Sequence, residues 1–174
     1  TYHTPTQRAI ALEKYGHYVD ENKGNQTANQ LDIRRKGRAI MTTHQEPDYD
    51  AIAIGAGFAG LALIHHLREQ GQTIRVFDRA SDIGGTWTWN RYPGAMTDSE
   101  SYYYCLTFSK ELLQEWHWTR RYPDWKETLN YFHFVADKCD MWPHIQLNTE
   151  IVSADYQADS GLWKVTTGDG ETFT

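Results

Sequence analysis

The chain has 174 residues, of which 40% are hydrophobic, so it is long enough for one domain with a sizeable core. Its formal net charge of -6 argues against nucleic acid as a partner, because phosphate binding depends on clustered lysine and arginine. We expect no contact with a membrane, since no apolar run could span one and the N-terminus lacks a signal-peptide pattern. Cys105 and Cys139 have neither metal-binding nor CxxC spacing, which favours a reducing, cytoplasmic location.

Residues 1–47 differ in character from the rest of the chain. Ile10, Leu12, Tyr15 and Val19 have a helix-like spacing, and a polar stretch containing glycine and asparagine follows them. The pattern predicts a helical N-terminal arm over residues 1–47 and a separate α/β domain over residues 48–174.

A strand, a tight turn and a helix are predicted at the start of that domain. The apolar run after residue 48 meets the glycine cluster GAGFAG at residues 55–60, and helical apolar spacing follows through Leu61, Ile64 and Leu67. The next run, TIRVFDRA at residues 73–80, alternates like a strand and contains Asp78 at its end. Together these segments predict a βαβ unit with a parallel sheet.

The glycine cluster has the spacing of a dinucleotide fingerprint. Gly55 permits the tight turn, Gly57 lets the backbone approach a pyrophosphate, and Gly60 lets the helix lie close to the sheet. The helix N-terminus supplies N–H donors to the phosphates. Asp78 follows at about the expected separation of roughly 20 residues, where a carboxylate can accept ribose hydroxyls.

Residues 84–98, GGTWTWNRYPGAMTD, combine turn and aromatic residues in a pattern typical of neither an ordinary helix nor a strand. Two glycines let the backbone pass close under a ring system, and Trp87 and Trp89 offer flat apolar walls. The Pro93–Gly94 turn would bring Asp98 back toward the same cavity. An aromatic loop packed on its own domain is the alternative interpretation.

Taken together, GAGFAG, GGTWTWNRYPGAMTD and the following ESYYYCLTFSKELLQEWHW resemble the Baeyer–Villiger monooxygenases over about residues 49–173. These are FAD enzymes that use NADPH and molecular oxygen to convert ketones to esters or lactones via a peroxyflavin. The resemblance implies a Rossmann-like FAD-binding domain with a central parallel sheet and a β-hairpin. It also implies an incomplete two-dinucleotide architecture, in which the remainder of the polypeptide supplies the main NADPH site and this chain alone is inactive.

The resemblance also implies roles for particular residues. Asp98 would be catalytic by orienting an arginine beyond this chain, and Met96 and Thr97 would lie with it near NADP. Many members have arginine and cysteine at the positions of Met96 and Thr97, and usually glutamate at that of Asp78. The implied cofactor-binding residues are Gly55, Gly57, Phe58, Ala59, Gly60, Asp78, Arg79, Gly85, Thr86, Trp87, Thr88, Trp89, Asp98, Tyr104 and Ile151.

Two other functions stay open. One is a related flavin enzyme, either a class B monooxygenase that oxygenates nitrogen or sulfur or a flavin-dependent reductase. The other is a nucleotide-binding fragment without catalysis of its own.

The remaining aromatic and histidine residues favour packing over chemistry. His65 and His66 are adjacent on the predicted helix and point about 100° apart, so we expect no metal site there. Trp116 and Trp118 are predicted to pack within the domain. The terminal GLWKVTTGDGETFT predicts a β-hairpin with its turn at residues 168–170.

Overall fold

The computed structural model describes residues 46–174. The helical arm expected over residues 1–47 therefore lies almost entirely outside the described residues. In chain order the elements are β1 (Ala51–Ile54), α1 (Phe58–Glu69), β2 (Ile74–Phe77), α2 (Thr86–Trp89), α3 (Lys110–Glu115), α4 (Trp125–Lys138), the 3-10 helix η3 (Trp142–His144), β3 (Ile145–Gln146), β4 (Ile151–Gln157), β5 (Leu162–Thr167) and β6 (Thr172–Phe173).

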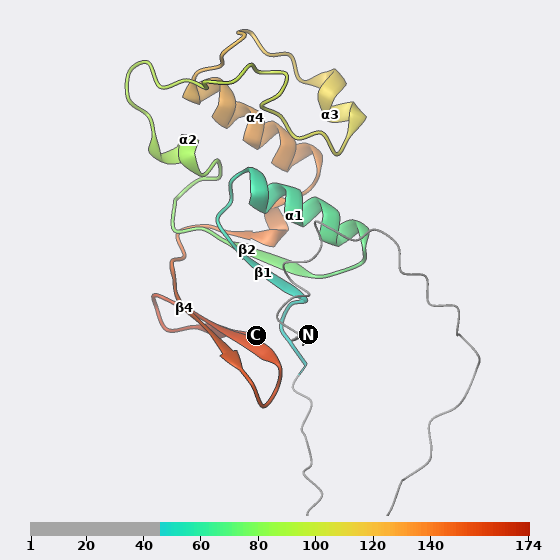
Figure 1. The fold of residues 1–174 in the computed structure, drawn as a ribbon, viewed down its shortest axis with the longest axis vertical. Helices are drawn as coiled ribbons and strands as arrows, with labels where there is room; N and C mark the ends of the chain where they lie inside the picture. The colour runs from blue at the N-terminus through green and yellow to red at the C-terminus, as the bar shows by residue number, and fades with distance from the viewer. Residues whose placement is uncertain (1–45) are drawn as a thin grey trace, which may run out of the picture. The chain divides into compact units, whose positions relative to one another are not determined.

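A parallel sheet forms the centre of the described domain, as the sequence predicts. Its strands follow the order β1-β2-β3, with Ala53 of β1 paired to Val76 of β2 and Val76 paired to Ile145 of β3. The crossover from β1 to β2 runs through α1, which makes the βαβ unit (Figure 1). This confirms the α/β, Rossmann-like class.

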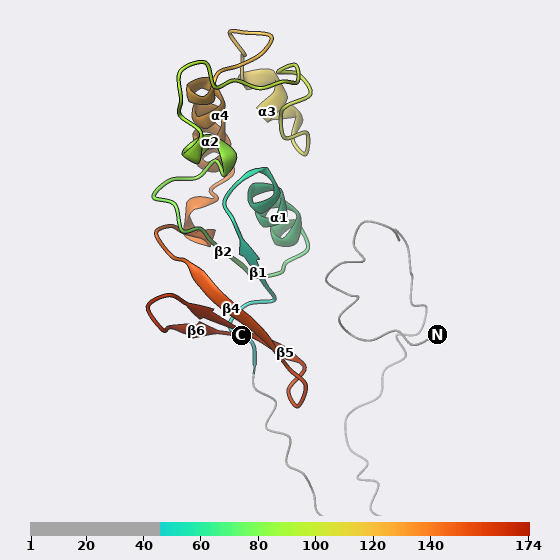
Figure 2. The same ribbon diagram turned by 60° about the vertical axis from the view of Figure 1, so that its left-hand side comes forward.

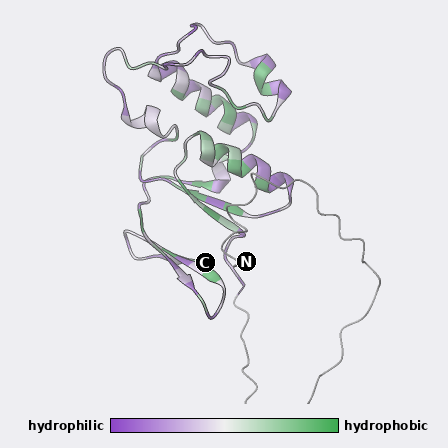
Figure 3. Cartoon of the chain, viewed as in Figure 1, coloured by the Kyte–Doolittle hydropathy of each residue, from purple (hydrophilic) through white to green (hydrophobic). Residues whose placement is uncertain are grey.

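Helix α1 covers one face of this sheet (Figure 2). Its buried residues include Leu61, Ile64 and Leu67, which recur at helical spacing. They belong to the same hydrophobic core cluster as Val76 of β2. Hydrophobic residues are concentrated in β1, β2 and the N-terminal part of α1, whereas the C-terminal part of α1 is hydrophilic (Figure 3). The apolar stripe thus sets the helix against the strands.

A second, antiparallel sheet in the order β4-β5-β6 lies on the other side of β1 and β2 from α1 (Figure 2). Val165 pairs with Phe173 across the predicted terminal hairpin, which is confirmed. The rings of Phe77 and Phe173 have centroids 5.0 Å apart, so β6 packs under β2. Thr174 donates its backbone N–H to the Asp48 carboxylate at 2.8 Å, which ties this sheet to the start of β1.

Helix α4 supports the irregular segment between α2 and α4. It begins after Asp124, whose carboxylate accepts the Glu127 N–H at 2.9 Å as an N-cap. Tyr131 is buried on α4, and the rings of Trp116 and Trp118 lie 5.4 and 4.9 Å from its ring, so their predicted packing role is confirmed. Burial raises the pKa of Tyr131 to about 12, and its neutral hydroxyl oxygen accepts the Leu106 N–H at 2.7 Å.

The structure differs from the sequence prediction at residues 86–89, which form one helical turn, α2. The backbone N–H of Trp87 bonds to the Gly84 carbonyl, so the turn starts directly from the two glycines. Asn90 closes it by donating both its backbone N–H and its side-chain amide to the Thr86 carbonyl, each at 2.9 Å. Tryptophan and threonine are poor helix formers, and it is these local bonds that hold the turn.

Over residues 46–174, no helix has the length and apolar character needed to cross a membrane. The same part of the chain contains no group of three or more histidine, cysteine, aspartate or glutamate side chains placed to hold a metal ion.

The close approach of α1 to the fingerprint turn yields a stability prediction. A Cβ at Gly60 would lie 2.2 Å from the Gly55 carbonyl oxygen, which is backbone and cannot rotate away. We expect Gly60→Ala to lower the free energy of unfolding by about 2 kcal/mol. Gly57→Ala is the matched control, since its Cβ would meet Gly85 at an ordinary 3.5 Å. Denaturant unfolding of the intact protein would measure both, and equal stability of the two variants would contradict the prediction.

Candidate dinucleotide-binding site

The fingerprint loop, residues 55–57, joins the end of β1 to the start of α1. Gly55 has a φ of +107°, a backbone conformation that side chains disfavour, and its N–H donates to the Phe77 carbonyl at 2.7 Å. The loop therefore leaves β1 while still bonded to the end of β2. This placement is the strand, tight turn and helix that the glycine spacing predicts.

Both backbone groups of Ala56, the middle residue of this loop, are held by hydrogen bonds. Its N–H donates to Oδ2 of Asp78 at 2.7 Å, and its carbonyl accepts the Gly84 N–H at 2.8 Å. The other Asp78 oxygen, Oδ1, accepts the Ala80 N–H at 2.8 Å. Asp78 is only 7% exposed, so the acid predicted for ribose binding also has a structural task, which is to join the fingerprint loop to the segment that follows β2.

Two glycine backbones meet beside the fingerprint loop. Gly85 belongs to the cradle loop, residues 79–85, which connects β2 to α2; it has a φ of +53°. A Cβ built on Gly57 would lie 3.5 Å from the Gly85 Cα, and one built on Gly85 would lie 3.3 Å from the Gly57 Cα. Any larger side chain here would occupy the space beside the start of α1.

The N-terminus of α1 is suited to an anion. The helix has 12 residues, its N-cap is Gly57, and no side chain caps its first turn in the part of the chain described. No acidic residue occupies that turn. The first N–H groups of a helix lack intrahelical partners and carry the positive end of its dipole. A diphosphate bridging the two glycine backbones fits these donors, because backbone approaches them without side chains in the way.

Aromatic side chains line the region next to this cradle, the place at the start of α1 where the backbones of Gly57 and Gly85 meet. Trp87, 7% exposed on α2, donates its indole N–H to the Tyr104 hydroxyl at 2.9 Å. Tyr104 also contacts Phe58, the first residue of α1, edge to face with centroids 4.9 Å apart. Trp89, by contrast, is 58% exposed, and the Arg79 guanidinium lies 5.3 Å from its ring centre.

Asp98 lies on a separately supported segment. Residues 95–101 run antiparallel to residues 121–125, with bonds such as Thr97 N–H to the Pro123 carbonyl at 3.0 Å and Ser101 N–H to the Arg121 carbonyl at 2.7 Å. Thr97 is buried, whereas Met96 and Asp98 on either side of it are exposed. Within residues 46–174 the Asp98 side chain makes no hydrogen bond, so it is free to meet a group from elsewhere.

An ion pair closes this ladder. The Arg121 Nε donates to the Glu100 carboxylate at 2.8 Å. Hydrogen bonding from Tyr102, and next from Arg121, holds the pKa of the Glu100 carboxyl below its ordinary value. Glu100 thus stays ionised at neutral pH and keeps its bond to Arg121, two residues from Asp98.

The predicted residues therefore fall into separate groups. Gly55, Gly57, Gly60 and Asp78 lie around the fingerprint loop, with Phe58 and Ala59 at the start of α1. Thr86 and Thr88 belong to α2, and Ile151 is the first residue of β4. Within residues 46–174, no hydrogen bond joins Met96, Thr97 or Asp98 to the fingerprint loop.

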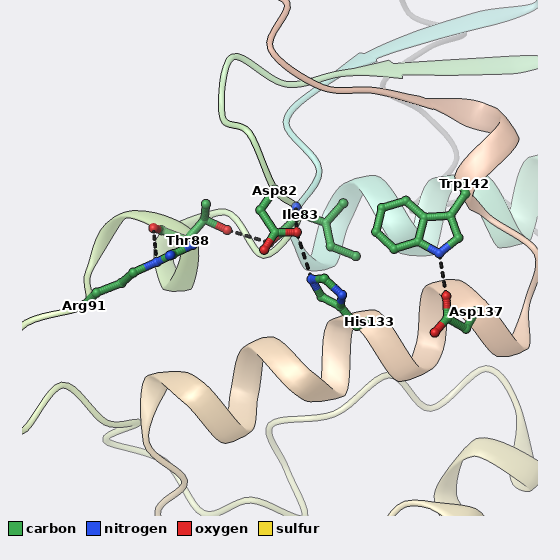
Figure 4. A network of polar contacts seen from close by, with 7 residues as sticks. All are labelled: Asp82, Ile83, Thr88, Arg91, His133, Asp137 and Trp142. Atoms are coloured by element: carbon green, nitrogen blue, oxygen red, sulfur yellow. Dashed lines mark hydrogen bonds and ion pairs between the residues drawn. The ribbon is translucent and has the colours of Figure 1, made fainter.

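Sequence analysis missed a polar network behind the cradle loop (Figure 4). Nε2 of His133 on α4 lies 2.8 Å from Oδ1 of Asp82, and the Thr88 hydroxyl donates to the Ile83 carbonyl. Arg91 in turn donates its Nε to the Thr88 carbonyl at 2.8 Å. No sequence signal links these residues, because His133 lies 51 positions from Asp82.

The strand, glycine loop and helix, with an acid at the end of the second strand, define a dinucleotide-binding domain. Residues 54–132 match the family described as an NAD(P)-binding Rossmann-like domain. A Baeyer–Villiger monooxygenase from Pseudooceanicola batsensis is 50% identical over 128 residues, which cover 73% of this chain and 24% of that protein. Over the matched residues the chain is similar to the Baeyer–Villiger monooxygenases.

Two further comparisons show the spread of similar proteins. A phenazine N-monooxygenase from Lysobacter antibioticus is 45% identical over 135 residues, covering 77% of this chain and 25% of that protein. The crystal structure of cyclohexanone monooxygenase from Rhodococcus sp. Phi1, bound to NADP+, superimposes with a TM-score of 0.70 at 45% identity, covering 72% of this chain and 24% of that one. The chain thus spans about a quarter of the length of the relatives it matches.

The two hydrogen bonds that the Asp78 carboxylate accepts from backbone N–H groups give the prediction for this site. Asp78→Ala would leave the Ala56 and Ala80 N–H groups without their partner, so we expect a loss of about 2–4 kcal/mol in the free energy of unfolding. Asp159→Ala, at an exposed turn, is the control and should unfold like the parent protein. Thermal unfolding would measure both, and an Asp78→Ala protein as stable as its parent would refute the structural task of this carboxylate.

Proposed function

We propose that this chain is the FAD-binding part of an NADPH- and oxygen-dependent Baeyer–Villiger monooxygenase that converts ketones to esters or lactones. The observation that carries the proposal is the paired approach of Gly57 and Gly85 at the uncapped start of α1, in a chain that is 50% identical to a Baeyer–Villiger monooxygenase over 128 residues. The partners of the whole protein would be a ketone, molecular oxygen and the remainder of the polypeptide. A cytoplasmic location stays a prediction.

The cofactor would be held by backbone more than by side chains. The N–H groups of Phe58, Ala59 and Gly60 would face the diphosphate, with Gly55 and Gly57 giving it room. Asp78 would accept ribose hydroxyls with the lone pairs that its two backbone bonds leave free, since each carboxylate oxygen has two acceptor positions. Arg79 at the cradle loop and Ile151 at the start of β4 would meet the adenosine end.

The ring system of the cofactor would lie against α2. Gly85 and the turn Thr86, Trp87, Thr88 and Trp89 would line it, and Trp87 is kept in one orientation by its bond to Tyr104. When bound, FAD supplies the redox chemistry that takes electrons from NADPH and delivers oxygen to the substrate. The aromatic side chains exclude water from that region, which strengthens electrostatic interactions within it.

Asp98 would act on the catalytic side as the residue that orients a downstream arginine, with Met96 and Thr97 near NADP. Its exposure next to the buried Thr97 supports this role, because the ladder with residues 121–125 sets the direction of the side chain before any partner arrives. A carboxylate held in this way would align a guanidinium through paired N–H bonds. That arginine would in turn stabilise negative charge as oxygen adds to the carbonyl carbon.

N-oxygenation is the second candidate function, favoured by the 45% identity to a phenazine N-monooxygenase. Incubating the full-length protein with NADPH and either a cyclic ketone or phenazine, followed by mass spectrometry, separates the two. A lactone supports the proposal, and an N-oxide without any lactone supports the alternative. A flavin-dependent reductase would consume NADPH and form neither product.

The glycine cradle predicts a loss of cofactor. Gly57→Val in the full-length protein should abolish the flavin absorption band, because a branched side chain would occupy the place of the diphosphate. Gly168→Val, at an exposed turn of the distant hairpin, is the matched control and should stay yellow. A fully loaded Gly57→Val protein would rule out this cradle as the FAD site.

A second prediction concerns Asp98. Asp98→Ala should leave FAD bound but slow flavin reduction or oxygen insertion at least tenfold, or about 1.4 kcal/mol in the barrier. Asp155→Ala, also exposed but on β4, should turn over like the parent enzyme. Stopped-flow absorbance would measure the two half-reactions. If Asp98→Ala carries out both half-reactions at the rates of the parent enzyme, Asp98 is a surface acid without a catalytic role.

A further inference from the structure

The cradle loop needs support from outside itself. Gly84 and Gly85 have φ values of +120° and +53°, which glycine adopts freely but also leaves freely. Two hydrogen bonds to nearby loop and turn residues hold the cradle loop: the Gly84 N–H donates to the Ala56 carbonyl, and the Thr88 hydroxyl donates to the Ile83 carbonyl. A loop built from such residues stays in one conformation only if neighbouring elements hold it.

Helix α4 supplies that support at two positions one turn apart. A Cβ built on Gly84 would lie 2.6 Å from Cδ1 of Leu129, so this leucine packs directly on the glycine. Four residues later, His133 places its Nε2 2.8 Å from the Asp82 carboxylate (Figure 4). Side chains at i and i+4 share one face of a helix, which is the face that α4 turns toward the cradle loop.

One oxygen of the Asp82 carboxylate links His133 to the backbone beside the glycines. Oδ1 of Asp82 accepts both from His133 and from the Ile83 N–H, the latter at 2.9 Å. Ile83 directly precedes Gly84, and its carbonyl is held by Thr88. Both the N–H and the carbonyl of Ile83 are thus hydrogen-bonded. The bond of the N–H depends on the orientation of the Asp82 side chain, which the contact with His133 fixes.

We propose that His133 is a positioning residue for the cofactor cradle: through Asp82 it holds residues 82–85 in the conformation that brings Gly85 against Gly57. The inference rests on the proposed function, because the cradle is taken to be that of FAD. The imidazole can donate from Nε2 when it is protonated and also as its neutral Nε2–H tautomer, so the role requires a hydrogen bond and not a charge. Since the His133 and Asp82 side chains are 42% and 25% exposed, direction matters here more than Coulomb attraction.

The test uses the full-length protein freed of flavin and titrated with FAD, with flavin fluorescence as the readout. His133→Ala should raise the dissociation constant about threefold to tenfold, the range of one lost hydrogen bond. His133→Gln, whose amide can donate to Asp82, should restore binding to within about twofold of the parent. Asp137→Ala is the matched control: it removes the 2.6 Å bond from Trp142 on the same face of α4 but no contact to the cradle loop.

A second measurement works without any flavin. Amide hydrogen exchange of the apoprotein at residues 82–86 should be faster in His133→Ala than in the parent or in Asp137→Ala. Asp82→Ala should have the same effect, and the double variant should be no worse than either single one, because both remove the same link.

The outcomes separate this inference from the function it rests on. A parent protein that does not bind FAD overturns the proposed function, while the exchange data still report on the loop. A parent that binds FAD, with His133→Ala binding equally well, overturns the positioning role alone. Equal losses in His133→Ala and Asp137→Ala would also overturn it, since they would show a general weakening of α4.

Discussion

The bond between the Asp78 carboxylate and the Ala56 N–H is the interaction on which the rest of this domain depends. It is 2.7 Å long, nearly buried, and joins the end of β2 to the middle of the fingerprint loop. With the Ala56 carbonyl bound to Gly84, the peptide groups on both sides of Ala56 are immobilised. Gly55 and Gly57 are flexible residues, but they lie on either side of Ala56, whose backbone is fixed by these hydrogen bonds. The loop therefore keeps one conformation.

Helix α4 connects the two parts of the candidate site. Its middle turns contact the cradle loop through Leu129 and His133, and the segment leading into its first turn, residues 121–125, pairs with the segment that carries Asp98. A shift of this helix would therefore move the cofactor cradle and the candidate catalytic acid together. The buried face of α4, which includes Tyr131, Phe132 and Val135, resists such a shift by packing on the core.

Sequence reasoning reached those features that depend on local spacing. The glycines of the fingerprint, the acid at the end of β2 and the terminal hairpin each follow from residues close together in the chain. It could not find the pairing of His133 with Asp82, since two partly exposed polar residues, one on a helix and one in a loop 51 positions away, have no sequence pattern in common. It also assigned Asp78 to a ligand only, because the backbone groups that compete for its oxygens become its neighbours only after folding.

The contact of Thr174 with Asp48 affects the order in which the domain folds. It joins residues 126 positions apart, whereas the Asp50 carboxylate meets Thr73, at the start of β2, after only 23. Loop-closure entropy makes the longer connection harder by about 1.5 kcal/mol, so β1, α1 and β2 can assemble first and the β4-β5-β6 sheet docks on them later. During synthesis, the dinucleotide fingerprint would thus take shape while the segment that covers the other side of its strands is still being made.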